Sequence, residues 1–415
     1  MAQRKKDIKG EITMQNVRKV TEDIYWLGVN DEDLQIFEEF IPIPEGVAYN
    51  SYLLVDEKTV LFDTADIRVA DEFLSNVKQA LDGKTLDYLV VQHMEPDHSC
   101  CIKHILEIYP KVTVIGNKKT FQFMRQFGVD IKNENIKEVV EGDTISFGKH
   151  TIAFAFAPMV HWPEVMVSYD KTSGVLFSAD AFGSFGKVKE KLFSDEVDYD
   201  KDWLEQARRY YTNIVGKYGA PVQSLLKKAG TLDIKMFLPL HGLIWRENLG
   251  YFLDKYNKWS TYEPEEKGVL IVYASMYGNT EKAVGVFEGM LKEKGVNNIA
   301  TYNISNTDVS YLISETFRLS HVVIACPTYN TNIFPLMHEY LMRLATLNLK
   351  NRTFGIIENS TWAPVAGDII HKYLTEELKG MTVLEERVRI VSALNEANDP
   401  EMEGLVESLV QSLEL

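Results

Sequence analysis

Residue types that bind metals crowd one short stretch of the chain, "VQHMEPDHSC" at positions 91–100. Two imidazoles and two carboxylates, His93, Glu95, Asp97 and His98, follow directly after the apolar run "LDYLVV". Side chains spaced two, four and five positions apart in a loop at the end of a strand can converge on one point, and this donor mixture is typical of metal ligands. We therefore predict a metal site at the end of a buried strand.

Three later residues extend the candidate ligand set. His161 lies in "APMVHWPE", Asp180 in "LFSADAFG" and His241 in "FLPLHGLIW", and each follows an apolar run that reads as a strand. A single buried histidine is more often a hydrogen-bonded core residue, so the compact cluster carries the interpretation. Together the candidates comprise four histidines and three carboxylates, enough for two metals that share a bridging carboxylate.

A second constellation lies in "YASMYGNTEKA", where the apolar strand "VLIVYAS" gives way to a helix. Hydroxyls and backbone N–H groups at a helix N-terminus suit a phosphate, and Gly278 allows the backbone to approach it closely. The G-K-[ST] and G-x-G-x-x-G patterns are absent, which argues against a P-loop and against a dinucleotide fingerprint. An ordinary, well-capped strand–helix junction remains the alternative.

Two further loops favour the ligand interpretation. "CPTYNTNIFP" (326–335) and "ENSTWAP" (358–364) end two other strands of the same expected sheet, at the edge where doubly wound folds bind ligands. Tyr329 and Trp362 could stack on a flat ring. The three loops predict a flavin mononucleotide (FMN) site formed by Ser275, Met276, Tyr277, Gly278, Asn279, Thr280, Pro327, Thr328, Tyr329, Asn330, Thr331, Asn359, Ser360, Thr361 and Trp362.

The pattern of predicted strands and helices changes near residue 261. Before it, β-rich runs with intervening helices, including one long amphipathic helix expected over 201–219, suggest a two-sheet sandwich with helices outside. After the polar "TYEPEEKG", strands and helices alternate, which predicts a doubly wound parallel sheet. We expect an α/β two-domain protein: an αββα sandwich followed by the parallel sheet.

Bulk composition narrows the classes of function. The chain has 415 residues and a formal net charge of -16, which argues against nucleic acid or an anionic membrane as partner. No apolar run reaches the ~18 residues of a membrane span, and no secretory signal is visible, so we expect a cytoplasmic protein. The three cysteines include no C-x-x-C pair, so a rubredoxin-type site is not expected.

The metal cluster resembles that of the metallo-β-lactamase fold, whose zinc hydrolases carry H-x-H-x-D-H. Here Glu95 stands at the second position. A carboxylate adds negative charge and a hard oxygen donor, which favours iron over zinc in a bridged two-metal site and so suggests redox chemistry. Zinc also accepts carboxylates, so a zinc hydrolase fused to a flavodoxin-like module remains an alternative.

In combination, "HMEPDH", "HWPE", "SADAFG", "HGLIW", "SMYGNT" and "PTYN" resemble the flavodiiron protein family, which reduces oxygen or nitric oxide. The resemblance implies an N-terminal extension (1–20), a metallo-β-lactamase-like diiron domain (21–262), a linker (263–267) and a flavodoxin-like FMN domain (268–415). It also implies a head-to-tail homodimer or a tetramer.

The same resemblance implies roles for the individual residues. One iron would be held by His93, Glu95 and His161, the other by Asp97, His98 and His241, with Asp180 bridging them. FMN would relay electrons from rubredoxin or reduced coenzyme F420. The preferred gas, O2 or NO, and the donor stay open.

Some positions depart from the family's pattern or carry no assigned role. Glu38 stands where many members have a histidine near the metals, and Leu240 stands where many have a serine. Lys187, Lys189 and Lys191 could help to dock an acidic donor or form a solvated loop. A non-enzymatic electron carrier is a third alternative, but it would not explain why the chain carries seven potential metal ligands.

Overall fold

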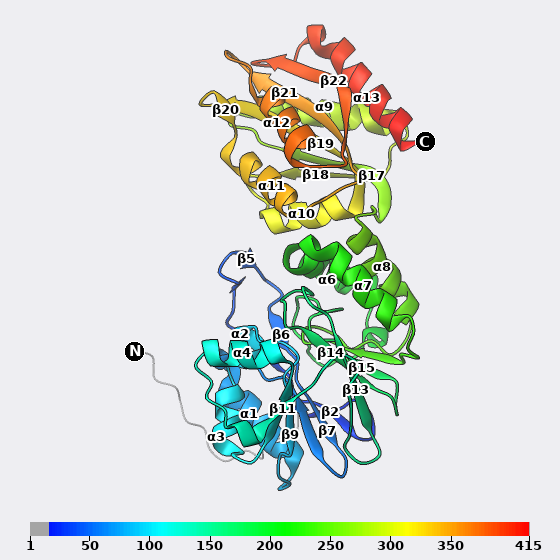
Figure 1. The fold of residues 1–415 in the computed structure, drawn as a ribbon. Helices are drawn as coiled ribbons and strands as arrows, with labels where there is room; N and C mark the ends of the chain where they lie inside the picture. The colour runs from blue at the N-terminus through cyan, green and yellow to red at the C-terminus, as the bar shows by residue number, and fades with distance from the viewer. Residues whose placement is uncertain (1–15, 415) are drawn as a thin grey trace.

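The computed structural model describes residues 16–414, so most of the predicted N-terminal extension lies outside the described residues. Figure 1 shows a lower part that contains two sheets, an upper part that contains one, and a group of helices between them. Among residues 16–414, no helix is long and apolar enough to cross a membrane.

The lower part is built on two sheets. The first has seven strands, and the second has five. In spatial order the first sheet contains β1 (Arg18–Lys19), β2 (Ile24–Trp26), β7 (Tyr52–Val55), β8 (Thr59–Phe62), β9 (Tyr88–Val90), β10 (Thr113–Gly116) and β11 (Ile136–Glu138). The second contains β12 (Thr144–Ser146), β13 (Thr151–Phe156), β14 (Met166–Asp170), β15 (Val175–Phe177) and β16 (Met236–Leu238). Neighbours pair antiparallel from β1 to β8 and from β12 to β15, and parallel elsewhere.

Apolar side chains from the two sheets meet in a shared core. Phe62 of β8 and Phe177 of β15 stack with ring centroids 3.8 Å apart, and Tyr52 of β7 meets the edge of Phe177. Helices α1 (Ala70–Leu81), α3 (Ile102–Ile108) and α4 (Lys118–Gln126) lie beside the first sheet (Figure 1). In α1, Phe73, Val77 and Leu81 recur every four residues and are buried. This arrangement confirms the predicted αββα sandwich.

The single long helix predicted over residues 201–219 is wrong. The segment contains α5 (Tyr199–Asp202), α6 (Leu204–Tyr210), a π-helical turn (Tyr211–Val215), a 3-10 turn (Gly216–Tyr218) and the start of α7 (Gly219–Ala229). Nearly all residues from 206 to 216 are buried, because the segment lies between the two parts of the molecule. Contacts on several sides, rather than one apolar stripe, therefore determine its path.

The upper part is a parallel sheet in the order β18 (Ile299–Asn303), β17 (Glu266–Tyr273), β19 (Leu319–Tyr329), β21 (Thr353–Ser360) and β22 (Thr382–Val391), with the short β20 (Asn332–Ile333) antiparallel to β19. This is the flavodoxin-like strand order 2-1-3-4-5. Helices α9 (Asn279–Glu293) and α13 (Asp399–Leu413) contact each other over one face, and α10 (Val309–Arg318), α11 (Pro335–Thr346) and α12 (Ala366–Lys372) pack with the other. The predicted doubly wound sheet is confirmed.

The connection between the parts is held by buried polar contacts. Helix α8 (Leu249–Thr261) is followed closely by β17, and the side chain of Glu265 between them is fully buried. Glu265 accepts hydrogen bonds from Arg208, from Lys255 at 2.8 Å and from the Trp259 indole at 2.6 Å. The Arg352 guanidinium, also buried, donates to the carbonyl of Tyr262 at 2.7 Å. The segment expected to be a polar linker is thus anchored on both sides.

We expect Gly219→Ala to destabilise this junction. A Cβ at Gly219 would lie 2.3 Å from the carbonyl oxygen of Ser260, so α7 and α8 would have to separate. Such overpacking costs about 2 kcal/mol of unfolding free energy. The measurement is denaturant-induced unfolding followed by tryptophan fluorescence.

Gly285→Ala in α9 is the matched control, because a Cβ there meets nothing within 4 Å. It should stabilise the helix by roughly 0.5–1 kcal/mol. Equal stability of the two variants would contradict the close packing of α7 on α8.

Candidate metal centre and cofactor pocket

The cluster at residues 93–98 is fixed by the ends of two neighbouring strands. Asp63, directly after β8, accepts hydrogen bonds from the backbone N–H groups of Gln92 at 2.8 Å and His93 at 3.2 Å. The short helix α2 (Pro96–Ser99) then begins with proline at its first position, which suits a residue without an N–H. His93, Glu95 and His98 are thereby held in a tight strand–turn–helix connection.

The other three candidates come from loops that follow strands of the second sheet. His161 follows β13, Asp180 follows β15 and His241 follows β16. All three side chains are buried. The structure brings all seven predicted ligand residues together in two adjacent groups. Within each group, the donor atoms lie within 4.8 Å of one another.

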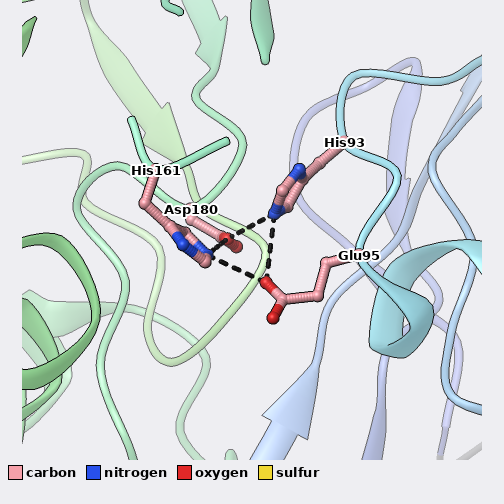
Figure 2. A group of neighbouring side chains, drawn as sticks. All are labelled: His93, Glu95, His161 and Asp180. Atoms are coloured by element: carbon pink, nitrogen blue, oxygen red, sulfur yellow. Dashed lines mark hydrogen bonds and ion pairs between the residues drawn. The ribbon is translucent and has the colours of Figure 1, made fainter. Parts of the chain in front are cut away.

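The first group contains His93, Glu95, His161 and Asp180, and their side chains point toward one another in Figure 2. Glu95 Oε2 lies 3.2 Å from His93 Nε2 and 2.8 Å from His161 Nε2. Asp180 Oδ2 lies 3.1 Å and 3.2 Å from the same two nitrogens. Two imidazole nitrogens and two carboxylate oxygens thus surround one point.

The second group contains Asp97, His98 and His241. Asp97 Oδ2 lies 3.3 Å from the Nε2 atom of each histidine, and the two Nε2 atoms are 3.0 Å apart. The other oxygen of Asp180, Oδ1, lies 3.2 Å from His98 Nε2 and 3.7 Å from His241 Nε2. Asp180 therefore presents one oxygen to each group, which is the geometry of a bridging carboxylate.

The ligand residues can hold two metal ions, because their histidine nitrogens and carboxylate oxygens have lone pairs that no hydrogen bond uses. His93 Nδ1 donates to Glu164 Oε1 at 2.8 Å, and His241 Nδ1 donates to the carbonyl of Ala48 at 2.9 Å. These bonds leave the Nε2 lone pairs directed into the groups. Among the described residues, both side-chain oxygens of Asp97 and of Asp180 are buried without a hydrogen-bond donor. Buried acceptors in this number call for a cation.

The electrostatics of the groups point the same way. Burial by itself lowers the pKa of His161, but the adjacent carboxylates of Asp180 and Glu95 raise it to about 9. Burial by itself raises the pKa of Asp180, yet the neighbouring histidines His93 and His98 hold it well below its usual range. The carboxylates therefore favour positive charge at this point, which metal ions supply.

Two residues that orient the ligands were not singled out from the sequence. Glu164 lies three residues after His161 in the quoted "HWPE", and it also accepts a hydrogen bond from the Met94 N–H at 2.9 Å. Asp63 directly follows the apolar run "TVLF". An acid directly after a strand was the available signal for Asp63, whereas Glu164 lies in the loop between β13 and β14 and gave no such signal. The partners of both residues are distant in sequence.

Glu38, whose role was left open, stands at the mouth of the metal centre. It lines a cavity of about 230 Å³ together with Glu95, Asp97, Tyr49 and Arg68. The pKa of Glu38 is raised to about 7, chiefly because the carboxyl group loses hydration and secondly because the Glu95 carboxylate lies nearby. Glu38 thus faces the open side of both ligand groups.

The predicted cofactor residues gather around one pocket of about 320 Å³ at the strand ends of the upper sheet. Every predicted residue except Gly278 lines it. Gly278 instead precedes α9 as its N-cap residue with φ +84°, a conformation that suits glycine. Ser275 Oγ accepts hydrogen bonds from the N–H groups of Gly278 at 3.1 Å and Glu281 at 3.3 Å. The loop therefore has the shape of a phosphate-binding turn.

Exposed rings flank this pocket. Tyr277 is 90% exposed, Trp362 71% and Tyr329 40%. Such large apolar surfaces around a polar pocket suit a flat aromatic ligand. Ser392 also lines the pocket and was missed by the sequence analysis, although it follows β22 and so obeys the same strand-end rule as the other loops.

The lysine run lies in a groove of mixed charge. Lys187 pairs with Glu32 at 2.8 Å. The groove, of about 660 Å³, is lined by four lysines and four carboxylates: Lys187, Lys189, Lys191, Lys201, Glu45, Glu190, Asp202 and Glu205. This balance weakens the prediction that an acidic donor docks there.

Glu164→Ala should lower metal affinity without removing a ligand. Loss of the carboxylate frees the His93 ring and reduces its basicity, and changes of this kind cost roughly 10–100-fold in affinity. The measurement is Fe²⁺ retention against a competing chelator. Glu141→Ala, an exposed acid of the same type, is the control. Equal retention by both variants would show that the hydrogen bond between Glu164 and His93 has no role in metal binding.

Gly278→Ala should weaken flavin binding. A Cβ there meets nothing within 4 Å, so the cost comes only from the positive φ. A strain of about 1 kcal/mol corresponds to a roughly fivefold loss of affinity. Titration of flavin-free protein with FMN, followed by quenching of flavin fluorescence, measures it. Gly289→Ala has equally open space but lies within α9, and should bind FMN normally.

Comparisons with known proteins agree with this geometry. A family model described as ODP family beta lactamase matches residues 47–242. An uncharacterized protein of Methanocaldococcus jannaschii is 35% identical over 78% of this chain and 81% of its own length. The anaerobic nitric oxide reductase flavorubredoxin of Vibrio vulnificus is 31% identical over 86% of this chain and 72% of its own. The structure of rubredoxin oxygen:oxidoreductase from Desulfovibrio gigas superposes with a TM-score of 0.88 at 26% identity, covering 96% of this chain and 98% of that one. The chain belongs to the flavodiiron protein family of oxidoreductases.

Proposed function

We propose that this chain reduces O2 to water, NO to nitrous oxide, or both, at a two-iron centre held by the seven residues, with FMN in the upper pocket. The observation that carries the proposal is the position of Asp180, which offers one buried oxygen to each ligand group. His93, Glu95 and His161 hold one iron, and Asp97, His98 and His241 hold the other. The division of the chain at 263–267 into a diiron domain and an FMN domain is part of the same proposal.

The electron count supports the pairing of these cofactors. When bound, two ferrous ions and one reduced flavin supply the four electrons that convert O2 to two waters, whereas two NO molecules need only two electrons to give nitrous oxide and water. The ligand residues are almost fully buried. The Glu38-lined cavity, too small for a large substrate, suits a diatomic gas.

The donor is external in this proposal. The Desulfovibrio gigas relative is named for rubredoxin, which supports a rubredoxin-type donor, and reduced F420 is the alternative. In Figure 1 β21, whose last two residues line the pocket, lies in the upper part, whereas β9, which leads to the metal centre, lies in the lower part. A head-to-tail homodimer, alone or within a tetramer, would bring the flavin of one copy to the metal centre of the other.

A zinc hydrolase of the metallo-β-lactamase fold is the competing function. The named relatives are reductases, and Glu95 supplies an oxygen donor where such hydrolases carry histidine. Metal content separates the two functions, because zinc has no redox chemistry.

The test measures metal and flavin per chain, then consumption of each gas by the donor-reduced protein. We expect about two irons and one FMN per chain, and turnover of at least one gas. Glu95→Ala should abolish gas consumption while its FMN is still reduced by the donor, and Glu57→Ala, at an exposed acid, should behave as wild type. Full activity of Glu95→Ala, or an iron-loaded and flavin-loaded protein that consumes neither gas, would refute the proposal.

A further inference from the structure

A file of aromatic side chains begins beside the metal centre. The Tyr256 hydroxyl accepts a hydrogen bond from the Phe182 N–H at 2.6 Å, and Phe182 lies two residues after Asp180. Tyr256 is 1% exposed. One hydrogen bond and two peptide units therefore connect its ring to the carboxylate that faces both ligand groups.

From Tyr256 the aromatic rings continue away from the centre. The ring centroids of Tyr256 and Phe252 are 5.5 Å apart, and Phe252 stacks on Trp245 at 4.3 Å with an interplanar angle of 9°. Trp245 then meets Tyr199 at 4.5 Å and Tyr251 at 6.3 Å. Phe252 also contacts Tyr199 directly at 5.7 Å. No gap along the file exceeds 6.3 Å between centroids.

The file ends in an open cleft of about 520 Å³. Trp245, Tyr199 and Tyr251 line it, together with the acidic side chains of Asp195, Asp198, Asp200 and Glu247. The Tyr251 hydroxyl donates a hydrogen bond to Asp200. The outermost ring thus has a carboxylate in place to receive its phenolic proton, and solvent reaches both.

A side branch of the file has a different ending. Trp259 lies 5.6 Å from Tyr256 and donates its indole N–H to Glu265. Arg208 and Lys255 bind the same carboxylate, so two cations surround this end. Positive charge on an oxidised Trp259 would be disfavoured there, whereas carboxylates surround the cleft. Lys255 Nζ also lies 5.6 Å from the Tyr251 ring centroid, but four carboxylates line the cleft against one at Trp259, so electrostatics favour the route to the cleft.

We propose that Tyr256, Trp245, Tyr199 and Tyr251 form a one-electron route that carries oxidising equivalents from the metal centre to this cleft. Tyrosine and tryptophan are oxidised more readily than phenylalanine, histidine and carboxylate groups. Tyr49, Tyr210 and Trp162 also lie beside ligand histidines, but in the described part of the chain none of these three rings contacts another tyrosine or tryptophan ring. The route would act when O2 enters a centre that has received fewer than four electrons. The inference rests on the proposed function, because O2 reduction supplies the oxidant.

The electrons and protons balance with a small thiol as the final reductant. Tyr251 loses one electron inward along the file and its phenolic proton to Asp200, which returns the proton to solvent. A thiol in the cleft then gives the tyrosyl radical a hydrogen atom, and two thiyl radicals combine to a disulfide. Two such passes replace the two electrons that an unreduced flavin fails to provide.

The experiment uses iron-loaded, FMN-loaded protein. It is first reduced with half the amount of donor that full four-electron reduction needs, and then mixed with excess O2. Rapid freezing and electron paramagnetic resonance should show an organic radical, which added dithiothreitol removes. Peptide mass spectrometry after repeated turnover should find added oxygen at Trp245 and at the cleft tyrosines.

The decisive variant is Trp245→Phe combined with Tyr199→Phe, which keeps an aromatic ring at each position but removes the two oxidisable groups through which the file reaches the cleft and Tyr251. We expect an unchanged initial rate of O2 consumption, loss of the cleft radical, oxidation shifted to residues beside the metals, and severalfold fewer turnovers before inactivation. Trp245→Tyr should behave as wild type, since tyrosine remains oxidisable. Tyr169→Phe, at a tyrosine bonded to the Asp233 carbonyl away from the file, is the matched control.

The outcomes separate this inference from the proposed function. If the wild type consumes O2 but shows no radical, or if all variants survive equally long, the rings serve only as core packing and the inference is wrong. If the wild type consumes NO but no O2, the inference fails while the proposed function stands; if it consumes neither gas, both fail.

Discussion

The Asp180 carboxylate is the contact on which the site depends. Its two oxygens lie between two sets of histidine nitrogens, so the loop after β15 must meet the loops after β9, β13 and β16 at one place. Those loops belong to different sheets. The stack of Phe62 on Phe177 between the sheets therefore does more than fill the core, because it sets the distance at which the two halves of the ligand set face each other.

A burial argument explains why so much surrounding structure is committed to this contact. Uncompensated carboxylates in a protein interior are costly. Asp63 and Glu164 hold the backbone and ring of His93, and Ala48 holds the ring of His241, so that the lone pairs converge. Without cations the site leaves buried acceptors unsatisfied. Metal binding and the local stability of these loops are thus coupled.

The sequence predicted the features that obey local rules. Strand ends, the sheet alternation and the seven ligand candidates could be found because each of the four segments that carry the candidates follows an apolar run. The same rule would have found Ser392 after β22. It could not predict the broken helix at 199–229, because contacts from both parts of the chain determine that segment. The pairing of Glu164 with His93 also escaped it, since 71 positions separate the two residues.

The buried Glu265 at the junction has a consequence for assembly. With Arg208, Lys255 and Trp259 on one carboxylate and Arg352 on the carbonyl of Tyr262, the upper and lower parts cannot swing freely. In a head-to-tail pair, the angle between the upper and lower parts would occur once in each chain. Together the two angles would set the separation between a flavin and the metals opposite it. Any bend at the junction would therefore act twice. A rigid junction would let two identical chains in the proposed dimer keep their electron-transfer distances without any flexible tether to adjust them.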